Sequence, residues 1–264
     1  MRKTASADGT TIAYDKWGSG PLVVIVGGAF NDRGTWAQLA QALASDFTVV
    51  SYDRRGRGDS GDTPPFAVER EIEDLNAVIA DASPDATAYA HAVSSGGALL
   101  LRAVAQGAPV HKASLLEPPY RVDGAPPAPQ DYRGTLRRLL ESGDRGAVVE
   151  YFTTQAVGLP PEAVAQMKTT PAWGYLGAMA HTLLYDAEAM GGDDHGLPTD
   201  LLARITIPVL AVSSTSSVAW LAGAAEAVAG ALPQGRYQRL EGGFHDIPVE
   251  VLAPALVTFY TEQR

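Results

Sequence analysis

Short apolar segments alternate with helical patterns along most of this chain, and this alternation limits the possible folds more than any other feature. Strands followed by helices connect through right-handed crossovers, which give a mainly parallel sheet with helices on both faces. The sequence therefore predicts an α/β fold. Strands are expected over 11–17, 22–26, 47–52, 87–93, 113–116, 209–212 and 237–240, and helices of the core over 68–80, 96–105, 218–231 and 249–261.

The first two expected strands are separated by Gly18-Ser19-Gly20-Pro21, which is a strong turn signal. We therefore expect them to pair as an antiparallel hairpin at the start of the fold.

The alternation stops after Glu117, where roughly ninety residues contain helical patterns and no convincing strand. Such a long connection between two strands predicts an inserted helical cap. The expected domains are a core of residues 1–117 and 208–264 and a cap of residues 118–207. Helices of the cap are expected over 132–141, 145–156, 161–167 and 172–185.

Composition limits the classes of function. The 264 residues include no cysteine, which excludes disulfides, thiolate metal sites and a thiol nucleophile. The net charge of −10 disfavours nucleic acid and anionic membranes as partners. No apolar run resembles a signal peptide or a membrane span, so we expect a cytoplasmic protein, a monomer or homodimer, that binds a small molecule.

Residues 92–97, Ala-Val-Ser-Ser-Gly-Gly, lie between an expected strand and an expected helix. A serine at such a turn is strained and needs small neighbours, and Ala92 and Gly96 provide them. This pattern is a variant of the G-x-S-x-G nucleophile elbow, which makes Ser94 the candidate nucleophile. The alternative is a Ser/Gly-rich loop that merely starts a helix.

Two backbone N–H groups are candidates for stabilising an oxyanion. The N–H of Ser95 lies at the N-terminus of the helix beside the nucleophile. The second candidate is the N–H of Ala29, which follows the glycine pair after the strand over 22–26. A glycine pair after a strand can also be a simple turn.

His245 is the candidate general base because it follows the last expected strand and precedes the last expected helix. A histidine in this place can reach over the edge of the sheet to a serine at the elbow. The other four histidines lack this placement. A lone loop histidine is otherwise usually solvated.

These motifs, together with Asp53-Arg54-Arg55-Gly56-Arg57-Gly58-Asp59-Ser60, resemble the α/β-hydrolase superfamily over nearly the whole chain. The resemblance implies a mostly parallel sheet of eight strands. Most members carry the triad acid after the strand that follows the cap, but residues 212–218 contain no acid. Some members take it from the end of the preceding core strand, where this chain has Glu117. Alternatively, Glu117 could simply be exposed to solvent at the start of a loop. Asp246 is a less suitable acid, because the residue next to His245 in the chain points away from its ring.

The order Ser, Glu, His also resembles the zearalenone-type lactone hydrolases, whose cap carries a tryptophan that contacts substrate. Trp173 lies in a similar segment. We therefore expect an aromatic substrate pocket, although such side chains can instead pack against the core. The residues expected to line the pocket are Phe30, Trp173, Tyr175, His181 and Tyr185.

The resemblance and these residues predict hydrolysis of a carboxylic ester or lactone of a small hydrophobic molecule through an acyl-enzyme on Ser94. The chemistry requires no metal and no organic cofactor. A thioesterase, a carbon–carbon bond hydrolase or a perhydrolase would use the same residues. A hydrolase-fold receptor remains open, as does a pseudoenzyme in which Glu117 lies far from His245.

Overall fold

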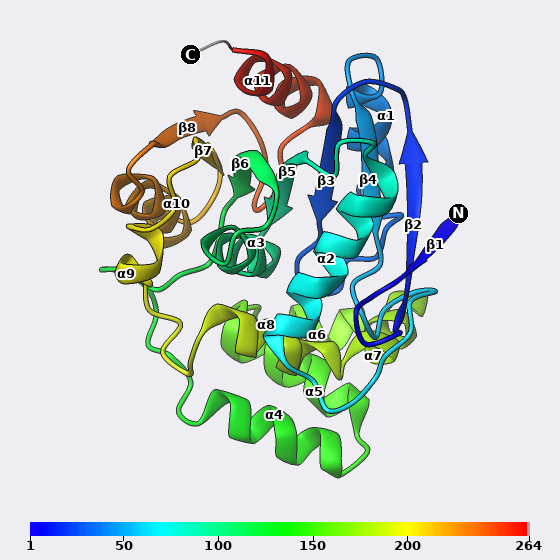
Figure 1. Cartoon of the computed structure of the whole chain (residues 1–264). Helices are drawn as coiled ribbons and strands as arrows, with labels where there is room; N and C mark the ends of the chain where they lie inside the picture. Colours follow the sequence, from blue (N-terminus) through cyan, green and yellow to red (C-terminus); the bar gives the residue numbers. More distant parts are fainter. Residues whose placement is uncertain (263–264) are drawn as a thin grey trace.

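The structure, a computed structural model, describes residues 1–262. Eight strands form one sheet in the order β1-β2-β4-β3-β5-β6-β7-β8 (Figure 1). The β1–β2 and β2–β4 pairs are antiparallel and the other pairs are parallel, which confirms the α/β class and the mostly parallel sheet. The strands are β1 (Arg2–Ala5), β2 (Thr11–Trp17), β3 (Leu22–Val26), β4 (Thr48–Tyr52), β5 (Ala88–Val93), β6 (Val110–Leu116), β7 (Val209–Ser214) and β8 (Gly235–Leu240).

The expected hairpin of residues 11–17 with 22–26 is wrong. β2 pairs instead with β1, a strand that the sequence analysis missed, and with β4. β3 lies on the other side of β4, and all five of its residues are buried. A strand that is apolar at every position is typical of the interior of a parallel sheet, and this explains its place.

Helices cover both faces of the sheet. α2 (Val68–Ala82), α3 (Ser95–Ala105) and α10 (Ala219–Ala231) contribute to a core cluster on one face. α1 (Ala37–Leu43) and α11 (Val249–Thr261) contribute to the cluster on the opposite face. The short α1 was not expected.

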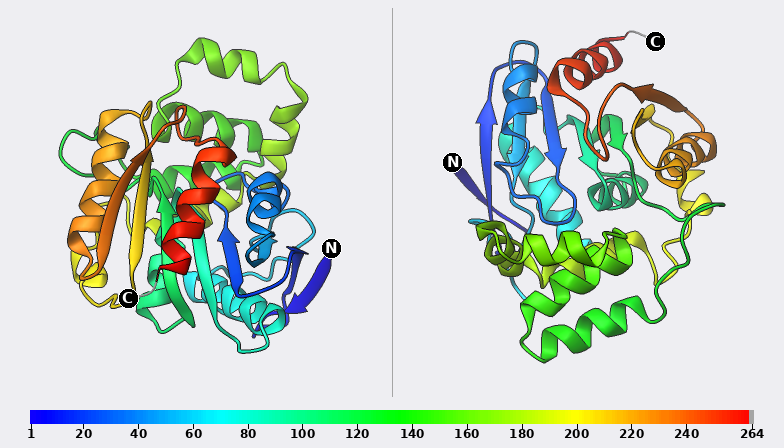
Figure 2. Two further views of the ribbon diagram at one scale, coloured as in Figure 1. Left: turned by 90° about the horizontal axis from the view of Figure 1, so that it is seen from above. Right: turned by 180° about the vertical axis from the view of Figure 1, so that it is seen from behind.

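The segment between β6 and β7 contains helices and no strand within the part of the chain that the structure describes, and we name residues 118–207 the insertion. Most of its helices lie together at one end of the sheet, whereas the last of them (Thr199–Leu202) lies beside α10 (Figures 1 and 2). They are α4 (Tyr132–Glu141), α5 (Arg145–Tyr151) with a π-helical turn (Phe152–Ala156), α6 (Pro161–Met167), α7 (Pro171–Met179), α8 (Thr182–Met190) and α9 (Thr199–Leu202).

The helix expected over 172–185 is two helices, α7 and α8. The break turns α8 toward the core, where Thr182 and Asp186 are buried. Tertiary contacts of these two side chains therefore set the boundary, which the local pattern does not show. Within residues 1–262, no helix has the length and apolar character needed to cross a membrane.

Candidate active site

The sheet offers a natural crevice beside β3. The chain leaves β3 toward α1 on one face, whereas it leaves the neighbouring β5 toward α3 on the opposite face. The loops at the carboxyl ends of these two strands therefore diverge, and such a switch point is where open α/β sheets bind ligands. A cavity of about 290 Å³ lies here, lined by loops after β3, β5, β6 and β8 and by the insertion.

Ser94 lies at the cavity in the expected strand-to-helix turn. Its φ of 53° and ψ of −129° are strained for a residue with a side chain. The turn fits because its neighbours are small: a Cβ on Gly96 would lie 2.5 Å from the carbonyl oxygen of Val26, and one on Gly28 would lie 2.8 Å from Cβ of Ser94. The glycines thus let the loop after β3 lie directly against the serine.

His245 and Glu117 are in direct contact. Nδ1 of His245 lies 2.7 Å from Oε2 of Glu117, and the backbone N–H of Ser214 donates to Oε1 at 2.7 Å. Glu117 is fully buried, and a buried carboxylate needs such partners. Ser214 ends β7, so the strand that follows the insertion contributes a backbone donor to the acid that follows β6.

The structure thus brings the three predicted triad residues to one place. Ser94 and His245 line the same cavity, and Glu117 contacts the imidazole. The pseudoenzyme alternative required Glu117 to lie far from His245, and the contact between the two does not meet this requirement. Asp246 is exposed.

The two candidate oxyanion donors also line the cavity. The neighbouring N–H of Gly28 donates to the side chain of Asn31 at 2.9 Å. Within residues 1–262, the N–H groups of Ala29 and Ser95 have no hydrogen-bond acceptor. They are therefore free to donate to a ligand in the cavity.

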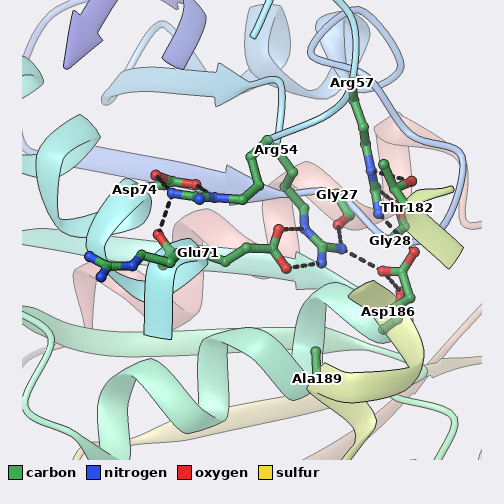
Figure 3. Close-up of polar contacts among 12 residues, drawn as sticks. Gly27, Gly28, Arg54, Arg57, Glu71, Asp74, Thr182, Asp186 and Ala189 are labelled. Atoms are coloured by element: carbon green, nitrogen blue, oxygen red, sulfur yellow. Dashed lines mark hydrogen bonds and ion pairs between the residues drawn. The ribbon is translucent and has the colours of Figure 1, made fainter. Parts of the chain in front are cut away.

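A buried ionic cluster supports the loop after β3. Arg54 lies between Glu71, which it contacts at 2.7 Å through two bonds, and Asp186 at 2.6 Å (Figure 3). Arg57 contacts the other oxygen of Asp186 at 2.7 Å. The two arginines also donate to the carbonyls of Gly27 and Gly28, which precede the candidate donor of the oxyanion site.

Asp186 comes from α8 and joins this cluster to the elbow. It accepts a hydrogen bond from the hydroxyl of Ser95 at 2.8 Å. Burial raises the pKa of Asp186, but Arg57 and Arg54 outweigh it and hold the pKa below its usual value. Asp186 is therefore a charged contact between the insertion and the elbow. Sequence reasoning missed this role because Asp186 is far from both arginines in the chain.

None of the five residues expected to form an aromatic pocket lines this cavity. Phe30 and Trp173 pack against the apolar cluster of the insertion. Tyr175 lies near Asp32 and is 46% exposed. The expectation rested on the aromatic pattern alone, and this pattern does not show which side of a helix faces the cavity.

The remaining two of the five, His181 and Tyr185, contact the core elsewhere. Both reach Asp62 in the loop between β4 and α2, at 3.5 Å and 2.8 Å. Tyr185 also stacks on Phe66, with ring centroids 3.9 Å apart.

Sequence reasoning missed other residues that line the cavity. They include Arg121, Tyr132, Phe152 and His195 of the insertion, Trp220 of α10 and Phe244 of the loop after β8. For the first four the only signal was their place in the insertion, and for Phe244 it was the neighbouring His245. Among the described residues no group of His, Asp and Glu side chains is arranged to hold a metal ion.

Comparisons with known proteins agree with this architecture. A model of the alpha/beta hydrolase family matches residues 23–255. An alpha/beta hydrolase of Sphaerobacter thermophilus is 48% identical, with a TM-score of 0.91 over 98% of this chain and 100% of that chain. An enol-lactonase of Burkholderia xenovorans has a TM-score of 0.68 at 22% identity, over 99% of this chain and 100% of that chain, which shows the fold.

The uncharacterized hydrolase YraK of Bacillus subtilis is 32% identical over 99 residues, and this match spans about a third, 36%, of each protein. The match of the family model covers most of the chain, and the Sphaerobacter structure is similar over nearly all of it. This chain belongs to the alpha/beta hydrolase family.

Proposed function

We propose that this protein is a serine hydrolase that cleaves a carboxylic ester or lactone of a small molecule through an acyl-enzyme on Ser94. The contact between His245 and Glu117 at a cavity that also holds Ser94 carries this proposal. As part of this proposal, residues 118–207 act as the cap that closes the cavity from above the sheet. An enol-lactonase shares the fold, but one fold supports many activities, so it is the geometry of the site that supports the proposal.

The proposed first half-reaction forms the acyl-enzyme. Glu117 accepts a hydrogen bond from the Nδ1–H of His245, which leaves Nε2 free to take the proton of the Ser94 hydroxyl. The serine oxygen attacks the carbonyl carbon, and the N–H groups of Ala29 and Ser95 stabilise the negative oxygen. The carbon–oxygen bond to the alcohol then breaks, and His245 returns the proton to the leaving oxygen.

In the second half-reaction His245 takes a proton from water, whose oxygen attacks the acyl carbon. The bond to Ser94 breaks, the serine regains its proton, and the carboxylic acid leaves. For a lactone the alcohol stays attached to the acyl group, so the product is one hydroxy acid.

The first test compares the wild type with Ser94→Ala on phenyl acetate and on a panel of γ- and δ-lactones. We expect the wild type to turn over members of this panel and Ser94→Ala to lose more than about 10³-fold in kcat. A fluorophosphonate should label the wild type covalently, with loss of fluoride, and leave Ser94→Ala unlabelled.

The matched control is Ser45→Ala, which removes an exposed hydroxyl after α1. It should keep turnover and labelling. Circular dichroism shows whether each variant folds. If the wild type shows neither turnover nor labelling, the proposed function is wrong.

A further inference from the structure

The cavity contains a second group of polar side chains, all from the insertion: Arg121, Tyr132 and His195. Two segments far apart in the sequence hold this group together. The N–H of Arg121 donates to the carbonyl of His195 at 2.8 Å, and Arg121 also forms a parallel bridge with Gly196. The proposed mechanism uses none of these side chains.

Arg121 has no carboxylate partner within residues 1–262. Its guanidinium donates to the carbonyl of Pro126, and its Nε is buried without any hydrogen-bond acceptor. Burial lowers the pKa of Arg121, yet an arginine stays charged in a protein. A partly desolvated charge of this kind is costly unless an anion compensates it.

The described lining of the cavity provides no such anion. Its single acid is Asp186, whose two oxygens are already bound by Arg54 and Arg57. The positive charge of Arg121 is therefore the uncompensated charge of the cavity. A ligand with a negative group would complement it.

Tyr132 and His195 offer hydrogen bonds beside this charge. Their rings meet edge to face with centroids 5.3 Å apart. Burial raises the pKa of Tyr132, so its hydroxyl stays protonated, and in the described chain this hydroxyl has no hydrogen-bond partner. Nε2 of His195 is buried and unpartnered. Burial and the nearby Arg121 lower the pKa of His195 to about 4, so its ring is neutral near pH 7.

We propose that Arg121, with Tyr132 and His195, binds a carboxylate of the substrate, so that the substrate is a small ester or lactone that carries an acid group away from its scissile bond. The guanidinium fork matches a carboxylate, and charge-assisted hydrogen bonds to it are strong. This inference rests on the proposed function, because it assigns the other end of the molecule that Ser94 attacks. It replaces the hydrophobic substrate expected from the sequence.

The test uses two acetate esters, one with a negative carboxylate and one in which a methyl group removes this charge, and it measures the release of acetate alone. These are 3-acetoxybenzoate and its methyl ester, which share the same acetyl group and a similar leaving group. The carboxylate lies far from the reacting carbonyl, so its binding should act on KM more than on kcat. We expect wild-type kcat/KM to favour the acid by about tenfold or more.

Arg121→Gln should reduce that ratio to about one, mainly through a higher KM for the acid. Arg121→Lys keeps the charge without the fork and should retain part of the preference. The control Arg137→Gln removes a positive charge from α4 outside the cavity, with a side chain that is 56% exposed. It should keep the wild-type ratio.

Equal kcat/KM for acid and methyl ester in the wild type would overturn the carboxylate site and leave the hydrolase intact. If the wild type hydrolyses neither ester, the proposed function is judged by turnover of the lactone panel and by covalent labelling of Ser94. The carboxylate site is then judged by titrating 3-hydroxybenzoate into wild type and Arg121→Gln in a calorimeter. Weaker binding to the variant supports the site, and equal binding refutes it.

A measurement on the wild type alone covers the case in which Arg121→Gln does not fold. Benzoate should inhibit hydrolysis of the methyl ester about tenfold more strongly than benzamide, which has the same size and no charge. Equal inhibition by the two would count against the proposal.

Discussion

Ser94, Glu117 and His245 share an unusual backbone conformation. Their φ angles are 53°, 47° and 52°, a region that residues with a side chain seldom adopt. Such strain costs on the order of 1–3 kcal/mol per residue and persists only where the surroundings enforce it. Here the N–H of Ser94 donates to the carbonyl of Leu116, directly before Glu117. The backbone thus fixes the nucleophile and the acid relative to each other.

The orienting role of Glu117 predicts the effect of Glu117→Gln. The N–H of Ser214 should retain the amide oxygen, so that the amide NH₂ faces Nδ1 of His245. The imidazole would then carry its proton on Nε2, where it cannot accept the proton of Ser94. We expect kcat to fall by about 10³- to 10⁴-fold on an ester that the wild type cleaves.

Asp246→Asn is the matched control, because it removes an exposed carboxylate next to His245 in the chain. Its kcat should stay within about twofold of the wild type. Steady-state kinetics and circular dichroism on both variants provide the comparison. Full activity in folded Glu117→Gln would show that Glu117 is not the orienting acid.

The positions of these three residues were predictable because each follows a strand that the sequence marks clearly. The chain order and the absence of an acid in residues 212–218 led to Glu117. Arg121 gave no comparable signal. Its importance depends on which side chains surround it, and that depends on contacts with His195, which is remote in the sequence.

At the scale of elements, helices with strong patterns were predicted well, such as α4, α6 and α11, whose bounds match. The errors occur where tertiary contacts decide. β1 has only four residues and no core pattern, and its pairing with β2 depends on the turn at Gly9. α7 and α8 separate because α8 turns its acid, Asp186, toward two buried arginines.

This arrangement predicts the effect of Asp186→Asn. The substitution leaves Arg57 buried without a carboxylate, whereas Arg54 keeps Glu71. Breaking a buried ion pair from one side costs about 3–5 kcal/mol. We expect the free energy of unfolding in urea to fall by about 3 kcal/mol, and kcat to fall because the carbonyls of Gly27 and Gly28 lose their rigid support.

The control Asp193→Asn tests whether removing another carboxylate of the insertion lowers the free energy of unfolding by as much. Asp193 pairs with Arg133 near the surface, and its side chain is 40% exposed. Such pairs contribute up to about 1 kcal/mol. If the free energy of unfolding falls equally in Asp186→Asn and Asp193→Asn, the buried cluster does not stabilise the contact of α8 with the core.

At the scale of the molecule, several polar contacts join the insertion to the core. They include the cluster at Asp186, the contact of Asp62 with His181 and Tyr185, and a hydrogen bond of 2.6 Å from Arg102 to the carbonyl of Ala189. The insertion therefore holds Arg121 at a fixed place above a sheet that holds Ser94. A substrate that reaches from Arg121 to Ser94 would be selected by its length as well as by its charge.

Buried histidines should make the stability of the molecule depend on pH. Burial lowers the pKa of His91 to about 4 from 6.5, and the pKa of His195 is also about 4. Between these values the unfolded chain binds more protons than the folded chain, so stability falls as pH falls. From pH 6.5 to 5 each histidine should contribute a loss of about 1.6 kcal/mol.

His91→Asn separates one of these contributions. We expect urea unfolding at pH 7, 6 and 5 to show about half the wild-type slope for this variant, because His195 still titrates. The control His111→Asn removes an exposed histidine and should keep the full slope. Between pH 7 and 6 the carboxylates stay ionised in both states, since their ordinary pKa is near 4, so this part of the slope reports the histidines. A wild-type slope of zero would therefore mean that His91 and His195 are as easily protonated in the folded molecule as in the unfolded chain.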